Sequence, residues 1–346
     1  MALPTNLGTE SIGRLLRQYA VPAIVAMTAS SLYNMIDSIF IGQGVGPLAI
    51  SGLAVTFPFM NLAAAFGALV GVGASTIVSV KLGQKDYASA RKALGNVVAL
   101  NIIIGVAFMV VSLLFLDKIL LFFGASENTL QYAREYMEII LYGNVVTHMY
   151  LGLNAVMRSG GHPQRSMAMT ILTVILNAIL DPIFIFVLDW GIRGAAIATI
   201  LAQIVALTWI LISFTNKQEM LHFESGIFKL DRRIVTASLS IGMAPFLMNV
   251  AACVIVIFIN NGLQQHGGDL AIGAYGIVNR ITFIFVMVVM GLNQGMQPIA
   301  GYNYGARNID RMLGVLKLTI IWAIVIMTAG FAICEFTPGL IARIFT

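Results

Sequence analysis

Two acidic residues stand in stretches of this sequence that are otherwise almost entirely apolar. Asp37, in SLYNMIDSIFIG, is the only charged residue between Arg17 and Lys81. Asp181 lies in NAILDP, sixteen residues beyond Arg165. A charged side chain at the centre of a membrane helix costs about 2.5–3.5 kcal/mol on insertion scales. We therefore expect both acids to serve a function, although an acid of this kind can also bond to neighbouring polar groups as a packing residue.

The residue types around Asp181 indicate a cation site. Asn177 precedes Asp181 by four residues, so both side chains lie on one helix face. Pro182 cannot donate a backbone hydrogen bond and crowds the carbonyl of Ala178, which predicts a bend and a free oxygen. Thr199 enters from the next helix at a similar depth. Carboxylate, amide and hydroxyl oxygens suit Na⁺, and a buried carboxylate can also carry a proton. We therefore expect Asp37, Asn177, Asp181 and Thr199 to bind a coupling ion, either H⁺ or Na⁺, with no other cofactor and with metal binding limited to Na⁺.

The composition indicates how these residues are positioned. Of the 346 residues, 59% are hydrophobic and only 10% are charged, whereas soluble domains carry about 25% charged residues. Apolar runs reach the roughly 20 residues needed to cross a membrane. We predict an all-α integral membrane protein with spans at residues 14–41, 48–79, 93–116, 129–157, 165–188, 193–215, 234–262, 270–298 and 313–336.

The positions of Lys and Arg predict the orientation of these spans. With the N-terminus in the cytoplasm, fifteen of these residues fall in inner segments and four in outer segments. We therefore expect a multi-pass protein of the plasma membrane or bacterial cytoplasmic membrane, in contact with lipids, with both acids in the outer half. The net charge of +5 arises from short loops between spans, which does not indicate a nucleic-acid partner.

A shift of 222 residues aligns the sequence with itself. It places Leu48-Ala49-Ile50 on Leu270-Ala271-Ile272, LGQKD on YGARN, and Gly73 on Gly295. Six spans separate equivalent points, so the two copies have the same orientation in the membrane. This predicts two parallel six-helix repeats around a central cleft, with about nine of twelve helices present.

The repeat also predicts the domain organisation. We expect an N-terminal six-helix lobe at residues 1–228 and a partial C-terminal lobe of three helices at residues 229–346. On this interpretation the chain is a fragment and has poor activity by itself. The alternative is a natural protein of nine spans.

These residues together resemble the multidrug and toxic compound extrusion (MATE) transporters. The resemblance is carried by Asp37, N-x-x-x-D-P at 177–182, GIRGAAIAT at 191–199 and RSGGHPQ at 158–164. It implies two six-helix lobes around a cleft that alternates between the membrane faces. It also implies exchange of Na⁺ or protons for organic, often cationic, small molecules through the acids of the N-terminal lobe.

The resemblance implies roles for further residues. Tyr33 and Asn154 match positions that support the cation site, and Asn34, Pro182 and Arg280 are candidates to support it or to line the cleft. Some members carry an acid in the seventh helix, where this sequence has Asn260 and Asn261. The N-terminal lobe would then have to couple transport alone.

Other functions find less support in the sequence. Tyr132, Tyr136 and Tyr142 are expected in an aromatic belt at the membrane interface. No motif of a metalloprotease, P-loop enzyme or serine hydrolase is present, so we expect a transporter, acting as a monomer, rather than an enzyme. A lipid-linked precursor flippase would need several cations in its cleft, where Arg280 is the one candidate. A non-transporting membrane scaffold would need no matched acids.

Overall fold

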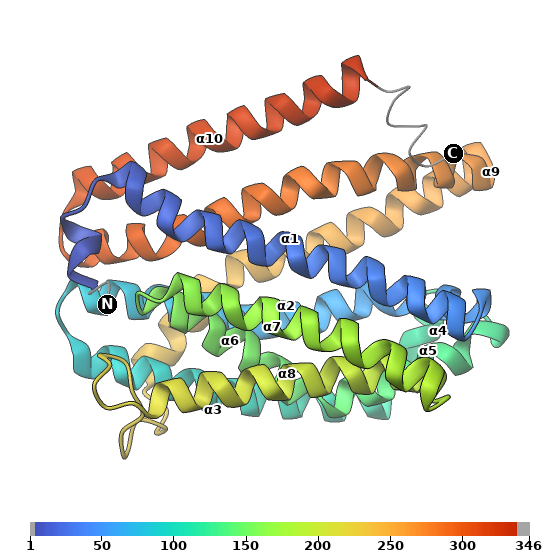
Figure 1. The fold of residues 1–346 in the computed structure, drawn as a ribbon, viewed down its shortest axis with the longest axis horizontal. Helices are drawn as coiled ribbons and strands as arrows, with labels where there is room; N and C mark the ends of the chain where they lie inside the picture. The colour runs from blue at the N-terminus through green and yellow to red at the C-terminus, as the bar shows by residue number, and fades with distance from the viewer. Residues whose placement is uncertain (1–3, 338–346) are drawn as a thin grey trace.

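The computed structural model describes residues 4–337, without the side chains at 4, 5 and 34 and at most positions of 256–281. The described part is helical, with short turns between most helices and a longer segment at 216–231 between α8 and α9 (Figure 1). The helices are η1 (Pro4–Gly8), α1 (Ile12–Gly44), α2 (Pro47–Gly83), α3 (Tyr87–Leu114), α4 (Leu116–Phe122), α5 (Glu127–Tyr142), α6 (Asn144–Ser159), α7 (Pro163–Pro182), η2 (Ile183–Val187), α8 (Gly191–Thr215), α9 (Arg232–Gly305) and α10 (Ile309–Phe336).

The predicted membrane spans correspond to these helices. Within the described residues, eight helical segments are long and apolar enough to cross a membrane, and the bent α5–α6 pair makes a ninth. The chain is therefore a multi-pass, all-α membrane protein, as predicted.

Two spans differ from the prediction in detail. The span at 129–157 is two helices that meet at an angle of 56°. The junction is Gly143, where an added Cβ would lie 2.2 Å from the Ile200 side chain, so the close approach of α8 requires a glycine there. The gap between the predicted spans 234–262 and 270–298 is helical, because α9 is continuous over Arg232–Gly305. Figure 1 shows that α9 nevertheless doubles back, with its two arms joined at the end of the molecule where α1 ends.

The repeat of 222 residues is present in the backbone. Helix α2 ends at Gly83 and α9 at Gly305, and α3 begins at Tyr87 and α10 at Ile309. The turns that follow α2 and α9 contain Lys85 and Arg307, with φ of 61° and 58°. A positive φ is uncommon outside glycine, so its recurrence at equivalent positions indicates the same turn in both copies.

The two lobes meet closely at the end of the molecule that carries the N-terminus. One core cluster there contains residues of both lobes, including Leu82, Leu94, Ile299, Tyr302 and Val315. A second cluster lies at the opposite end, and the described residues that form it, all between 40 and 200, belong to the first lobe. The lobes therefore share a core at the N-terminal end, and the first lobe has its own core at the far end. The division at residues 228 and 229 remains a prediction.

Glycine 73 illustrates how close the lobes are. An added Cβ at Gly73 would lie 1.8 Å from the carbonyl oxygen of Ser238 on α9. At Gly13, in the first turn of α1, an added Cβ would meet nothing within 4 Å. The two positions therefore form a matched pair for testing the contact between α2 and α9.

We expect Gly73→Ala to destabilise the protein by about 1–3 kcal/mol, because a carbonyl of the other lobe must move to make room. Gly13→Ala should leave stability unchanged or raise it slightly, because alanine favours the helix. Thermal unfolding in detergent checks both. Equal melting temperatures for the two variants would contradict this packing.

Candidate cation site and cavity

The structure brings Asp37 and Asp181 together in the first lobe. Asp37 lies on α1 and Asp181 on α7, two helices that pack against each other. The side chains are 4% and 0% exposed, respectively, and their carboxyl groups are close enough to interact electrostatically. The sequence-based expectation that the two acids share one location therefore agrees with the structure.

Local backbone geometry places Asp181 at an irregular point of its helix. Pro182 ends α7, and the chain continues as the π-helical turn η2. The amide of Leu188 donates to the carbonyl of Ile183 at 2.9 Å, five residues earlier. Because Pro182 cannot donate to Ala178, the ladder is interrupted next to Asp181. Single π turns of this kind are frequent at functional sites.

Thr199 joins the neighbouring helices through its hydroxyl group. The Asn177 amide donates to Thr199 Oγ1 at 3.2 Å, and Thr199 Oγ1 donates to the carbonyl of Ala195 at 3.1 Å. Tyr33 Oη lies 2.8 Å from Thr199 Oγ1 and must be the donor, since the threonine proton is already used. The hydroxyl group therefore has one donated and two accepted bonds, its full capacity.

Four buried oxygens of the site have no hydrogen-bond donor in the part of the chain that the structure describes. Among the described residues, Asp37 Oδ1, Asn177 Oδ1 and both carboxylate oxygens of Asp181 are buried without a hydrogen-bond donor. Buried acceptors without a donor are costly. Four acceptor oxygens around two acidic groups fit a Na⁺ ion or one or two protons, which would supply the missing positive charge. In this conformation Thr199 positions Asn177 and Tyr33, because its own oxygen is saturated.

A cavity of about 520 Å³ opens beside the site. Its volume falls within the range of small-molecule sites. Tyr33, Asp37, Tyr136 and Thr199 line one part of the wall, and Asp181 is not among the lining residues. Asp37 therefore faces the cavity, whereas Asp181 lies sealed behind it.

The other walls of the cavity are of two kinds. Apolar side chains line most of it, and a second polar group is formed by Asn61, Asn144, Thr147 and Gln203. The Thr147 hydroxyl donates to Gln203 Oε1 at 2.5 Å, which joins α6 to α8. The chamber thus combines one acidic group, neutral hydrogen-bonding groups and apolar surface.

Tyr136 belongs to this site, contrary to the expectation of an interfacial belt. Its side chain is 1% exposed and lies near both carboxyl groups. Tyr142 is 62% exposed and agrees better with that expectation. The heptad-like spacing of Tyr136 with Ala133, Met137 and Ile140, all buried on α5, is the sequence signal that distinguishes it.

Other predicted site residues lie elsewhere or outside the described side chains. The Asn154 amide donates to the carbonyl of Ser166 at 3.2 Å and to Thr170 Oγ1 at 3.4 Å, and its oxygen accepts from the Ser166 hydroxyl. Thr170 precedes Asn177 by seven residues, about 10 Å along α7. Asn154 therefore fastens α6 to α7 at a distance from the carboxyl groups. The side chains of Asn34 and Arg280 are not described, nor are those of Asn260 and Asn261.

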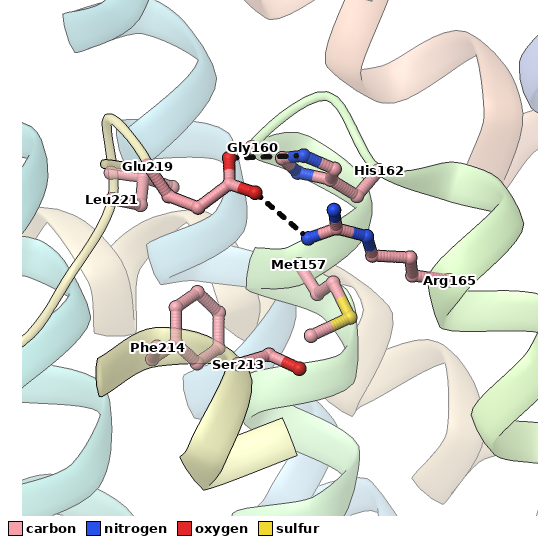
Figure 2. A pocket seen from close by; sticks show the side chains of 8 residues that line it. All are labelled: Met157, Gly160, His162, Arg165, Ser213, Phe214, Glu219 and Leu221. Atoms are coloured by element: carbon pink, nitrogen blue, oxygen red, sulfur yellow. Dashed lines mark hydrogen bonds and ion pairs between the residues drawn. The ribbon is translucent and has the colours of Figure 1, made fainter. Parts of the chain in front are cut away.

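A second polar cluster lies at the turn between α6 and α7 (Figure 2). Glu219, in the segment between α8 and α9, accepts from Arg165 Nη1 at 3.0 Å and lies 3.3 Å from His162 Nε2. Burial lowers the pKa of His162, and the Arg165 guanidinium is the second partner of the Glu219 carboxylate. The small cavity there, about 20 Å³, has room for about one water molecule. We interpret this cluster as an anchor for the segment that connects the lobes.

Comparisons with known proteins identify the family of the chain. The MatE family model matches residues 22–183 and 241–346. The chain is 31% identical over 325 residues to the multidrug export protein MepA of Staphylococcus haemolyticus (strain JCSC1435), covering 94% of this chain and 71% of that protein. It is 29% identical over 331 residues to MepA of Staphylococcus aureus (strain NCTC 8325 / PS 47), covering 94% and 73%.

A solved structure gives the same result for the fold. It is described as the outward-facing conformation of a multidrug resistance MATE family transporter of the MOP superfamily. It superposes with a TM-score of 0.92 at 25% identity, covering 99% of this chain and 76% of that chain. Since the family model matches most of the sequence and the fold agrees throughout, the chain belongs to the MatE family of multi-pass membrane transporters.

Proposed function

We propose that this protein exports organic, often cationic, small molecules in exchange for H⁺ or Na⁺, coupled through Asp37 and Asp181. The observation that carries the proposal is the pair of buried carboxyl groups with four acceptor oxygens lacking donors, beside a cavity of about 520 Å³. The relatives named as multidrug export proteins support the substrate class.

The position of Asp37 supplies a physical reason for exchange. It belongs to the ion site and also to the cavity wall. An organic cation in the cavity and an ion between the carboxyl groups would both be stabilised by the same negative charge, so each weakens binding of the other. An inward ion gradient then drives export, with about 2.3 kcal/mol per charge for each 100 mV of membrane potential.

The conformation also fits a transport cycle. Described residues of both lobes share a core at the N-terminal end, whereas the described residues of the core at the opposite end are all from the first lobe. We infer that this is the state closed at the N-terminal face. With the N-terminus in the cytoplasm of a plasma or bacterial cytoplasmic membrane, as the basic loops predict, the cleft faces outward. The protein would act as a monomer, because the described residues of the ion site and of the cavity wall all come from one chain.

A lipid-linked precursor flippase is the second candidate. Such a protein needs cationic groups to hold phosphates, yet no Lys or Arg is found among the described residues that line the cavity. The charged residue in that wall is Asp37, which repels phosphate. A non-transporting scaffold offers no reason for two adjacent buried acids. The site therefore favours export of cations.

We expect Asp37→Asn and Asp181→Asn each to reduce efflux of a cationic dye by about tenfold or more. Asn keeps the shape of the side chain but removes the charge that binds the ion. Dye efflux from cells, with and without Na⁺ and with a protonophore, measures the effect and identifies the ion.

The matched control for these variants is Asp189→Asn. Asp189 is exposed and has φ of 55°, a conformation that Asn tolerates. It should retain normal efflux at equal membrane levels. If the Asp37 and Asp181 variants also show normal efflux, both acids are packing residues and the proposed coupling is contradicted.

A finer test addresses the Thr199 hydroxyl group. Thr199→Val removes the group that receives hydrogen bonds from Asn177 and Tyr33, a loss of about 0.5–1.5 kcal/mol. We expect the half-saturating concentration of the coupling ion to rise roughly threefold to tenfold, because Asn177 is no longer held in place. Thr199→Ser retains the hydroxyl and should behave like the wild type. A similar shift in both variants would implicate the methyl group instead.

A further inference from the structure

The N-terminal segment of the first lobe is bound by residues of the second lobe. This segment comprises η1 and the residues up to Ser11, where α1 begins. Leu7 is only 2% exposed and belongs to the core cluster that the two lobes share. Gly8 lies against Tyr302, where an added Cβ would come within 3.3 Å of the ring.

Two polar side chains of the second lobe hold this segment by its backbone. The Asn303 amide donates to the carbonyl of Leu7 at 3.0 Å and to Ile299 of its own helix at 2.8 Å. Arg311 Nη2 donates to the carbonyls of Leu7 at 3.3 Å and Glu10 at 2.5 Å. Arg311 Nε also donates to Asn303 Oδ1 at 3.3 Å, so the two residues form one unit.

The repeat shows that these contacts are not needed to build the turn between α9 and α10. The equivalent positions in the first repeat are Lys81 and Ser89. Lys81 pairs with Asp86 at 3.3 Å, and the amide of Ser89 donates to Asp86 Oδ1 at 3.1 Å, all within the turn. The same backbone turn therefore forms without reaching another segment. Asn303 and Arg311 depart from that local pattern and reach the N-terminal segment instead.

The contact lies where the two lobes close. Next to this contact, Tyr302 of α9 packs against Gly83 of α2. One to two turns before Tyr302 on α9, the Gln297 amide donates to Thr76 Oγ1 at 2.7 Å. The Glu10 carboxylate pairs with Arg14 at 2.8 Å, whereas Arg311 binds the backbone carbonyl of Glu10. Arg311 is partly exposed, so water can replace the carbonyls when they separate.

We propose that Asn303 and Arg311 form a latch that holds the N-terminal face closed and that must release the Leu7 and Glu10 carbonyls before this face opens. The role of such opening in transport rests on the proposed function, whereas the latch itself is a property of the structure. Arg311 and Asn303 are positioning residues, because they contact neither the ion site nor the cavity.

The test measures the distance between α3 and α10 at this face. Spin labels are placed at Ala88→Cys and Asp310→Cys, exposed positions that are equivalent in the two repeats, after replacement of Cys253 and Cys334 by Ser. We expect a dominant short distance in the parent protein. Arg311→Ala should raise the ratio of long to short distances by about fivefold or more, because the closed state alone loses its hydrogen bonds.

Lys317→Ala is the matched control, since it removes the same charge from an exposed position of the same helix. It should leave the distance distribution unchanged. Leu7→Ala releases the segment from its other side and should give a shift in the same direction, which also tests the latch if Arg311→Ala folds poorly. The double variant Leu7→Ala/Arg311→Ala should shift no further than the larger single effect, because both changes free one segment.

Identical distributions for Arg311→Ala and Lys317→Ala would overturn the proposal, as would additive shifts in the double variant. The distance measurement requires no transport. A failure of the latch is thus distinguishable from a failure of exchange at Asp37 and Asp181, which the efflux assay reports separately.

Discussion

Two carboxyl groups are buried side by side in an apolar membrane protein, and the rest of the structure depends on that constraint. Asp37 and Asp181 are 4% and 0% exposed and lie on different helices, so they repel each other unless a cation or proton is shared. The surrounding groups are arranged around that need. Asn177 uses its amide on Thr199, which leaves its oxygen for the same cation, and the π turn after Pro182 interrupts the helix beside the acid. This pair of carboxyl groups is stable only when a positive charge is bound. The conformation of the helices that carry the pair, α1 and α7, therefore depends on the ion.

The arrangement of the two repeats determines which face of the protein this response to the ion reaches. Both repeats contain the same turn with a positive φ, at Lys85 and Arg307, so the lobes are built on one plan. They differ in what the residues near those turns contact. The shared core and the contacts of Asn303 and Arg311 join the lobes at the N-terminal end, whereas the ion site and its cavity belong to the first lobe. A change in charge at Asp37 can therefore alter α1, the helix that runs from the ion site to the closed face.

Much of this arrangement could be predicted from the sequence, for identifiable reasons. Long apolar runs give the spans, and the cost of a buried charge marks Asp37 and Asp181 as a pair. Tyr136 was not predicted as a site residue, because it was grouped with Tyr132 and Tyr142 and its spacing with the buried residues Ala133, Met137 and Ile140 was not considered. The 56° bend at Gly143 depends on the approach of Ile200, a tertiary contact. Asn154 uses its hydrogen bonds to join α6 to α7. Its partners lie 12 and 16 residues away on the next helix, so the spacing of residues in the sequence does not reveal them.

The most direct test of the central claim is to measure cation binding to the purified protein, by calorimetry with Na⁺ and by counting the protons taken up on acidification. The wild type and the double variant Asp37→Asn/Asp181→Asn are compared in the same detergent. We predict that the wild type binds Na⁺ or takes up protons that the double variant does not, with both proteins equally folded. Equal binding by the two proteins would show that the coupling ion is held elsewhere and would contradict the assignment of these acids.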